Sequence, residues 1–300
     1  MISSQAHIAM LLFKQQKRVL LAHKNNTYFM RKLFEYGTRF SPIPSHIQTS
    51  MQQLQDMQIM QISNLKPNRN QNKILFYIHG GGFVIGSAKS YKAYVASLCK
   101  ISEAEFAYLP DYRLAPEARF PNALNDVLAA WKYVTEKHPN HEIVLAGDSA
   151  GGNLALALCI KLRDLNLKLP IRTYLQSPWL DLTLTSLSHK KQDHRDPFLG
   201  TYFLERDFAR HYVGDADRKD PFISPLFADF TGLPPFYVQV GSKEVLLDDS
   251  REFIKRAKEY GVDATLDIWT GMWHAWPIVP FVPESKQARI KAGRWLASLG

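Results

Sequence analysis

Cysteine is scarce in this sequence. Its 300 residues include two cysteines, Cys99 and Cys159, and neither belongs to the C-x-x-C spacing of redox and zinc sites. A disulfide-stapled extracellular fold is therefore not expected, and we interpret both residues as reduced core thiols of a cytoplasmic protein. The patterns His-x-His, H-E-x-x-H and G-x-G-x-x-G are missing as well, so we expect no metal ion and no cofactor.

Long hydrophobic runs are also missing. The longest apolar run near the start covers residues 8–13, and basic residues follow it instead of preceding it. That order is not the order of a secretory signal. Nothing in the chain approaches the roughly 18 consecutive apolar residues that a membrane-spanning helix needs. Both observations favour a soluble protein of the cytoplasm.

Acidic residues are nearly absent from the first 50 positions. Glu35 stands there against seven Lys and Arg residues, so this segment carries most of the formal net charge of +9. A basic, partly amphipathic opening is compatible with contact to an anionic membrane surface. We favour the simpler interpretation, a helical lid whose charges face water. Because no nucleic-acid-reading motif accompanies the basic residues, we expect no nucleic-acid partner.

The pattern of apolar residues predicts an α/β protein. With 46% hydrophobic residues, 300 positions can bury one large core, so we expect a single domain over residues 1–300. Residues 74–78 and 143–146 are apolar on both faces, which is typical of buried parallel strands. Residues 264–269 form the last predicted strand, which we place at a sheet edge. Pairing through that strand makes a homodimer plausible.

The segment Gly147-Asp148-Ser149-Ala150-Gly151-Gly152 is the most informative stretch of the chain. It follows a predicted strand and precedes a predicted helix, and it fits the G-x-S-x-G pattern of a nucleophile elbow. Small residues on both sides let the serine adopt a strained backbone conformation and project its hydroxyl above the sheet. We therefore predict that Ser149 is a nucleophile.

A second glycine-rich segment, His79-Gly80-Gly81-Gly82, follows the buried strand 74–78. Three consecutive glycines cost chain entropy, so a function should require bare backbone at this loop. In serine hydrolases, amides of such a loop and the amide after the nucleophile converge on the developing oxyanion. We predict an oxyanion hole formed by the N–H groups of Gly81, Gly82 and Ala150.

These two motifs and the segment 111–117, in this order and spacing, resemble the hormone-sensitive-lipase family of α/β-hydrolase esterases, also called bacterial family IV. The resemblance covers roughly residues 57–295. It implies an α/β-hydrolase fold, with a mostly parallel eight-stranded sheet flanked by helices. It also implies a helical cap, which we assign to residues 1–45 and to the aromatic segment 186–215.

The remaining catalytic groups follow from chain order. An α/β-hydrolase places its acid and then its histidine after the serine, and His274 is the histidine that follows the last predicted strand. Glu244, Asp248 and Asp249 all follow the preceding strand. The family commonly carries Asp followed by Pro-Leu there, and this sequence departs from that pattern. Glu244 aligns with the acid, and we prefer it over the runner-up Asp248.

Together these residues predict a serine carboxylesterase that acts through an acyl-enzyme on Ser149. The resemblance implies small-molecule esters with short to medium acyl chains. A lactone or amide hydrolase would use the same triad, so sequence cannot choose between these leaving groups. A binding-only role also stays open, since the family includes a plant hormone receptor that has lost the catalytic histidine. The presence of His274 argues against that role here.

Overall fold

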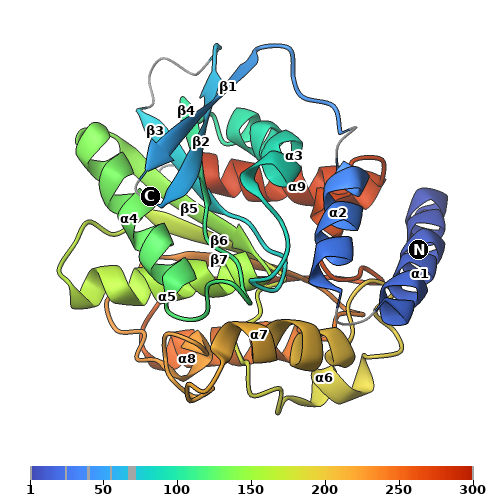
Figure 1. Ribbon diagram of the computed structural model, residues 1–300. Helices are drawn as coiled ribbons and strands as arrows, with labels where there is room; N and C mark the ends of the chain where they lie inside the picture. Colours follow the sequence, from blue (N-terminus) through green and yellow to red (C-terminus); the bar gives the residue numbers. More distant parts are fainter. Residues whose placement is uncertain (1, 24–25, 39–40, 55, 67–71, 299–300) are drawn as a thin grey trace.

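The fold is built on one sheet, seen in a computed structural model that describes residues 2–23, 26–38, 41–54, 56–66 and 72–298 (Figure 1). The strand order is β1-β2-β4-β3-β5-β6-β7-β8. β2 runs antiparallel to β1 and β4, and all neighbours from β4 to β8 are parallel. The strands are β1 (Ile47–Leu54), β2 (Met57–Asn64), β3 (Lys73–Ile78), β4 (Phe106–Asp111), β5 (Glu142–Asp148), β6 (Arg172–Gln176), β7 (Phe236–Gly241) and β8 (Ala264–Trp269). The predicted mostly parallel eight-stranded sheet is confirmed.

Burial across the sheet follows the hydrophobic pattern. β3 is buried along its whole length, as its apolar run on both faces predicts. β8 is half-exposed, as expected of an edge strand. β1, the opposite edge, is rich in glutamine and also largely exposed. The sheet therefore concentrates its apolar surface in the centre, where β5 delivers Ser149.

Helices cover both faces of the sheet. The core cluster on one face includes residues of α3 and α9, and the cluster on the other face includes residues of α4, α5 and α8. Their bounds are α3 (Ala88–Ile101), α4 (Asn122–Lys137), α5 (Ala150–Asp164), α8 (Leu247–Glu259) and α9 (Pro283–Ala297). This three-layer arrangement is the α/β-hydrolase architecture.

The remaining helices belong to the N-terminal segment and to the connections after β6 and β8. They are α1 (Ser4–Ala22), α2 (Thr27–Thr38), α6 (Leu187–Lys191), the π-helical turn η1 (Phe203–Ala209), α7 (Arg210–Val213) and the short 3-10 helices η2 (Pro225–Phe227) and η3 (Trp276–Ile278). Among the described residues, no helix has the length and apolar character needed to cross a bilayer.

Lys17 joins α1 to the connection after β6. Its ammonium group donates to the carbonyl oxygens of Asp193, Asp196 and Leu199 at 3.1, 3.1 and 2.9 Å. Nearby, the ring of Phe13 packs edge-on against Phe198, with centroids 5.2 Å apart. Two segments about 180 residues apart in the chain therefore form one layer beside the sheet.

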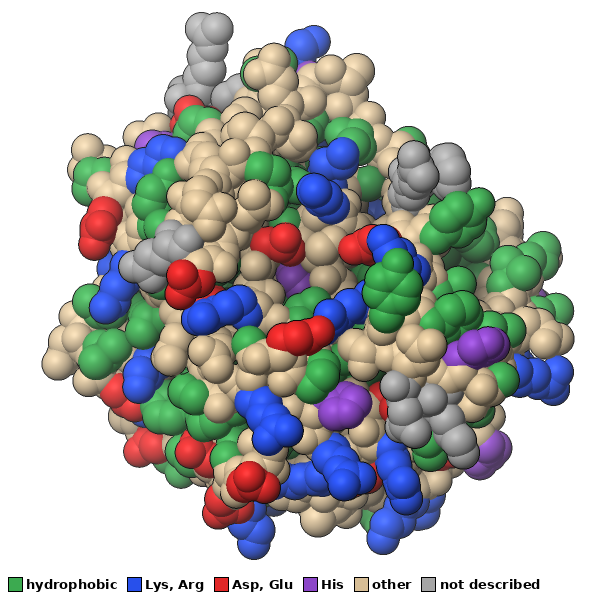
Figure 2. Space-filling view, viewed as in Figure 1, with side chains coloured by type: hydrophobic (Ala, Val, Ile, Leu, Met, Phe, Trp, Pro, Cys, Tyr) green, Lys and Arg blue, Asp and Glu red, His purple; other side chains and the backbone are tan. Residues whose placement is uncertain are grey.

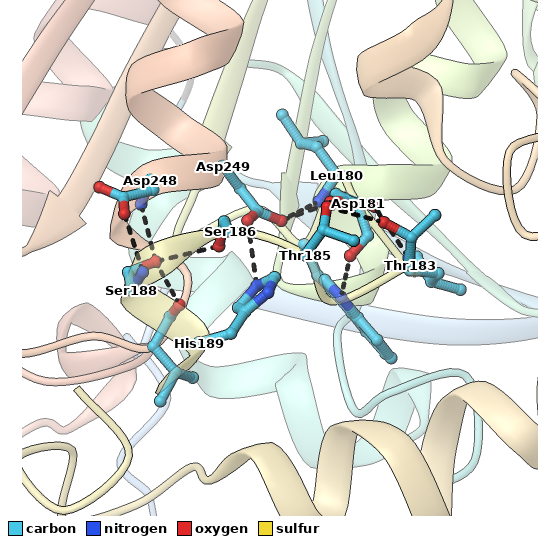
Figure 3. A network of polar contacts seen from close by, with 12 residues as sticks. Leu180, Asp181, Thr183, Thr185, Ser186, Ser188, His189, Asp248 and Asp249 are labelled. Carbon is cyan, nitrogen blue, oxygen red and sulfur yellow. Dashed lines mark hydrogen bonds and ion pairs between the residues drawn. The ribbon is translucent and has the colours of Figure 1, made fainter. Parts of the chain in front are cut away.

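A polar network fastens the same connection to the start of α8 (Figure 3). The wholly buried side chains of His189 and Asp249 lie 3.1 Å apart, from Nε2 to Oδ1. Burial alone would lower the pKa of His189, but the carboxylates of Asp249 and Asp181 and the backbone of Leu184 together raise it. Ser188 donates its N–H to Asp248 and its hydroxyl to the carbonyl oxygen of Val245. These contacts fix the loop that follows β7 to the connection after β6.

Candidate active site

Ser149 occupies the sharp turn between β5 and α5. Its backbone has φ 52° and ψ −121°, in the positive-φ region that non-glycine residues rarely adopt. A Cβ atom at Gly147 would overlap the backbone of Gly151, and one at Gly151 would overlap the backbone of Ile78 and His79. Glycine on both sides of the serine is therefore a steric requirement of this turn.

His274 and Glu244 extend from Ser149 as a chain of hydrogen bonds. The Oγ atom of Ser149 lies 2.9 Å from Nε2 of His274, and Nδ1 of His274 lies 3.1 Å from Oε2 of Glu244. All three side chains are buried. Each follows the carboxyl end of a different parallel strand, namely β5, β7 and β8. The topology brings together residues up to 125 positions apart.

Two donors hold the other oxygen of Glu244. The backbone N–H of Gly241 donates to Oε1 at 2.5 Å, and the Ser177 hydroxyl donates to it at 2.8 Å. Ser177 also accepts the N–H of Ala275, the residue after His274, at 3.2 Å. Ser177 thus bridges the acid loop and the histidine loop. Sequence reasoning assigned it no role, and its one signal was its place directly after β6.

Asp248 and Asp249 do not face the imidazole. Asp248 accepts the N–H of Ser188 and pairs with Arg251, whereas Asp249 accepts the N–H groups of Leu180 and Asp181. Both carboxylates fasten the start of α8 to the chain after β6. Of the three acidic residues that follow β7, the structure brings Glu244 to His274.

The environment of His274 favours a neutral imidazole. Burial lowers its pKa, and the negative charges of Asp196 and Asp148 act in the opposite direction. Burial also raises the pKa of Glu244. The hydrogen bonds that its carboxylate accepts from the N–H of Gly241 and the hydroxyl of Ser177 act in the opposite direction. A neutral imidazole with a free electron pair toward Ser149 is the form that a general base requires.

Asp196 is a further buried carboxylate beside this chain of groups. Its Oδ1 atom accepts the N–H groups of Phe198 and Leu199, each at 3.0 Å, and Oδ2 accepts the N–H of Val245 at 3.4 Å. Burial raises its pKa to about 6. The Phe198 ring, positioned by this loop, stacks on His274 with centroids 6.2 Å apart. No sequence pattern had marked Asp196.

The glycine loop after β3 lies beside Ser149. Gly81 and Gly82 have φ values of 112° and 62°, and both line the same cavity as Ser149. No acceptor among the described residues takes the N–H groups of Gly81, Gly82 or Ala150. Asp148 fixes the loop, because its Oδ1 atom accepts the N–H of Gly80 at 2.8 Å. Three unengaged amides near a serine can stabilise an oxyanion.

A cavity of about 670 Å³ opens above Ser149. Apolar side chains dominate its lining, and many come from α1, α2 and the connection after β6. Examples are Leu12, Phe13, Met30, Phe34, Phe198, Phe203 and Phe208. In the part of the chain that the structure describes, no group of three or more His, Cys, Asp or Glu side chains could hold a metal ion. The site therefore offers an apolar space beside a serine, an imidazole and a carboxylate.

Several known proteins are similar to this chain over most of its length. The alpha/beta hydrolase fold family matches residues 75–278. An esterase of Acinetobacter venetianus is 35% identical over 237 residues, which cover 78% of each chain. An acetyl-hydrolase of Streptomyces hygroscopicus is 38% identical over 234 residues, covering 77% of this chain and 78% of that one. Among solved structures, an esterase from the bacterial hormone-sensitive lipase family has a TM-score of 0.91 and 32% identity, covering 99% of both chains.

Proposed function

This chain belongs to the hormone-sensitive-lipase family of α/β-hydrolases and is a carboxylic-ester hydrolase, and from that premise we propose that Ser149, His274 and Glu244 perform its reaction. The observation that carries this assignment is the chain of hydrogen bonds of 2.9 and 3.1 Å from serine to imidazole to carboxylate. A serine hydroxyl is a weak nucleophile at neutral pH, and a positioned base is what activates it.

The first half of the reaction forms the acyl-enzyme. The Oγ atom of Ser149 attacks the ester carbonyl carbon while its proton passes to Nε2 of His274. Glu244 stabilises the resulting imidazolium through Nδ1. When the tetrahedral intermediate collapses, the imidazolium donates that proton to the departing alkoxide. The alcohol leaves, and the acyl group stays on the serine oxygen.

The second half reverses these roles. Water takes the place of the alcohol and loses a proton to Nε2 of His274 as it attacks the acyl carbon. Collapse of the second tetrahedral intermediate breaks the bond to Ser149, whose oxygen recovers the proton. In both intermediates the N–H groups of Gly81, Gly82 and Ala150 donate to the oxyanion. Loss of one such donor typically lowers turnover about a hundred- to a thousandfold.

We assign the acyl group of the substrate to the apolar wall of the cavity. The aromatic rings of Phe198, Phe203 and Phe208 offer the acyl chain an apolar surface, and the resemblance to the family implies short to medium chains. The test is a p-nitrophenyl ester series measured as kcat/KM, with a pre-steady-state burst as the sign of acylation. Butyrate should react faster than palmitate, and Ser149→Ala should lose the burst while keeping its circular dichroism spectrum. Faster turnover of palmitate would overturn the chain-length assignment.

We also propose that the segments 1–45 and 186–215 act as the cap of this site. The hydrogen bonds of Lys17 to the connection after β6 support that role. The Arg31 guanidinium supports it too, because it donates to Glu117 and to the carbonyl oxygens of Val84 and Ala115. These cations serve internal contacts, which favours a lid over a membrane anchor. On the side that carries α1 and α2, however, hydrophobic side chains reach the surface (Figure 2). Flotation with anionic vesicles tests the lid interpretation, which predicts no co-flotation.

A homodimer through β8 remains our proposal for the quaternary structure. β8 is an edge strand, and its Ile268 side chain is 40% exposed. Light scattering should report a dimer that Ile268→Lys converts to monomer.

A cytoplasmic location likewise remains a prediction, supported by two cysteines that are buried and unpaired. Fractionation of the host cell tests it directly.

A further inference from the structure

One cationic side chain enters the apolar cavity from α9. Arg289 lines the cavity together with Ser149 and His274 and is only partly exposed. Its Nη1 atom donates to the carbonyl oxygen of Pro277 at 2.7 Å. Among the described residues, no other acceptor receives a hydrogen bond from this guanidinium. Its Nε and Nη2 groups are therefore not engaged by any residue that the structure describes.

Arg289 also lacks a counter-charge. No carboxylate of the described residues lies within 4 Å of its guanidinium. Arg172 and Arg256 also form no ion pair among these residues and donate to carbonyl oxygens instead, whereas five other arginines are paired with carboxylates. Arg31, Arg113, Arg163, Arg218 and Arg251 each form an ion pair. Burial lowers the pKa of Arg289, and the phenol groups of Tyr94 and Tyr174 act in the opposite direction. Guanidinium groups stay protonated in proteins, so the cavity holds a lasting positive charge.

A partly buried cation is unfavourable unless something neutralises it. The hydrogen bond to the Pro277 carbonyl does not explain why position 289 is an arginine, because a neutral side chain with one N–H or O–H group could donate it. What a guanidinium adds is a planar edge with two parallel N–H groups, which matches the two oxygens of a carboxylate. The free edge of Arg289, formed by Nε and Nη2, is such a fork.

The cavity lining is polar in part. The wall formed by α1 and the connection after β6 is apolar, with Leu12, Phe13 and Phe198 as examples. Other lining residues, from α3 and α9, are polar, namely Ser90, Tyr94, Ser97 and Arg289. The hydroxyl of Ser90 donates to the carbonyl oxygen of Ser87 and that of Tyr94 donates to Gln176, so the free edge of Arg289 is the charged donor of this lining. A ligand that fills this space would therefore meet apolar groups in one region and the free edge of the Arg289 guanidinium in another.

We propose that Arg289 forms a carboxylate subsite, so that this esterase prefers esters carrying an ionised carboxyl group remote from the scissile bond. The proposal rests on the function assigned above, because it concerns a second region of the same cavity. Half-esters of dicarboxylic acids place the carboxylate on the acyl side, and esters of hydroxy acids place it on the alcohol side. Either would bring an anion to the free edge of the guanidinium.

The kinetic test compares matched charged and neutral esters. Methyl hydrogen adipate is paired with methyl hexanoate, and the butyrate ester of 4-hydroxybutanoate with butyl butyrate. The charged-to-neutral ratio of kcat/KM is measured for the wild type, Arg289→Gln and Arg289→Lys. We expect Arg289→Gln to lower the ratio about ten- to a hundredfold in at least one pair, and Arg289→Lys to lower it less. Lys286→Gln removes one charge from the exposed face of α9 and should leave the ratio unchanged.

A binding measurement separates this proposal from the catalytic one. Titration calorimetry of Ser149→Ala with adipate and with 4-hydroxybutanoate reports the subsite without turnover. The subsite is supported, even if no ester is hydrolysed, when Arg289→Gln in this background weakens the binding of either anion about tenfold or more. Lys286→Gln in the same background should leave that binding unchanged. An unchanged ratio in both pairs, together with equal binding to both variants, would overturn it. That result would show that Arg289 only holds the Pro277 segment.

Discussion

Replacing Glu244 by glutamine tests the triad most sharply, because the structure fixes which way the amide must point. Oε1 of Glu244 accepts the N–H of Gly241 at 2.5 Å, so the amide oxygen of Gln must occupy that position. An NH₂ group there would set two donors against each other. The NH₂ group therefore faces Nδ1 of His274, which must then accept a hydrogen bond and leave its proton on Nε2. An imidazole in that tautomer cannot take the proton of Ser149.

The expected loss is large although the shape of the side chain is kept. A wrong-tautomer histidine in a serine triad lowers kcat about 10⁴-fold, which corresponds to about 5 kcal/mol of activation free energy. Stopped-flow hydrolysis of p-nitrophenyl butyrate measures the loss, and the ¹⁵N shifts of His274 report the tautomer. Glu244→Asp keeps the charge and should lose less activity than Glu244→Gln.

Asp248→Asn is the matched control for this experiment. Asp248 was the alternative acid, and the structure places it against Ser188 and Arg251. Its replacement should change kcat less than threefold. If Glu244→Gln keeps kcat within tenfold of the wild type, or if Asp248→Asn causes the larger loss, the assignment of the acid is wrong.

Three further predictions concern the surroundings of the triad. Because burial lowers the pKa of His274, kcat/KM should fall only as the pH drops below the usual imidazole value of 6.5. Asp196→Asn should move that limb slightly further down, because Asp196, with a pKa of about 6, keeps only part of its charge in that pH range. Gly82→Ala should lower kcat about a hundredfold or more, since φ is 62° and the new Cβ would overlap the ring of Phe208. Lys17→Met should raise KM more than it lowers kcat and reduce the free energy of unfolding by about 1–3 kcal/mol, measured in urea. A pH profile that does not move, an active alanine variant, or an unchanged KM would contradict the respective prediction.

The elements with strong patterns could be predicted from sequence. β3 and β5 are continuous apolar runs, and the elbow around Ser149 combines glycines with a strand-to-helix change. Chain order then selected His274, and the departure from the family's usual acid motif still left Glu244 aligned. β1 was not assigned from its own pattern, because a glutamine-rich strand at an edge buries too little to show alternation.

Contacts between distant segments could not be predicted. Nothing in the local sequence distinguishes Ser177 from an ordinary loop serine, although it joins Glu244 to the backbone after His274. Asp196 likewise reads as a surface residue of a cap and is 1% exposed. Arg289 fits an amphipathic helix equally well on the solvent face or on the cavity face. Such roles depend on which elements pack together, and helical periodicity does not contain that information.

Covalent labelling of the nucleophile tests the central claim most directly. Intact-protein mass spectrometry after treatment with a fluorophosphonate should show one adduct, which peptide mapping places on Ser149. Ser149→Ala should show none, and His274→Ala should react at least a hundredfold more slowly. An unlabelled wild type, or an adduct on another residue, would contradict the proposal that Ser149 attacks the ester.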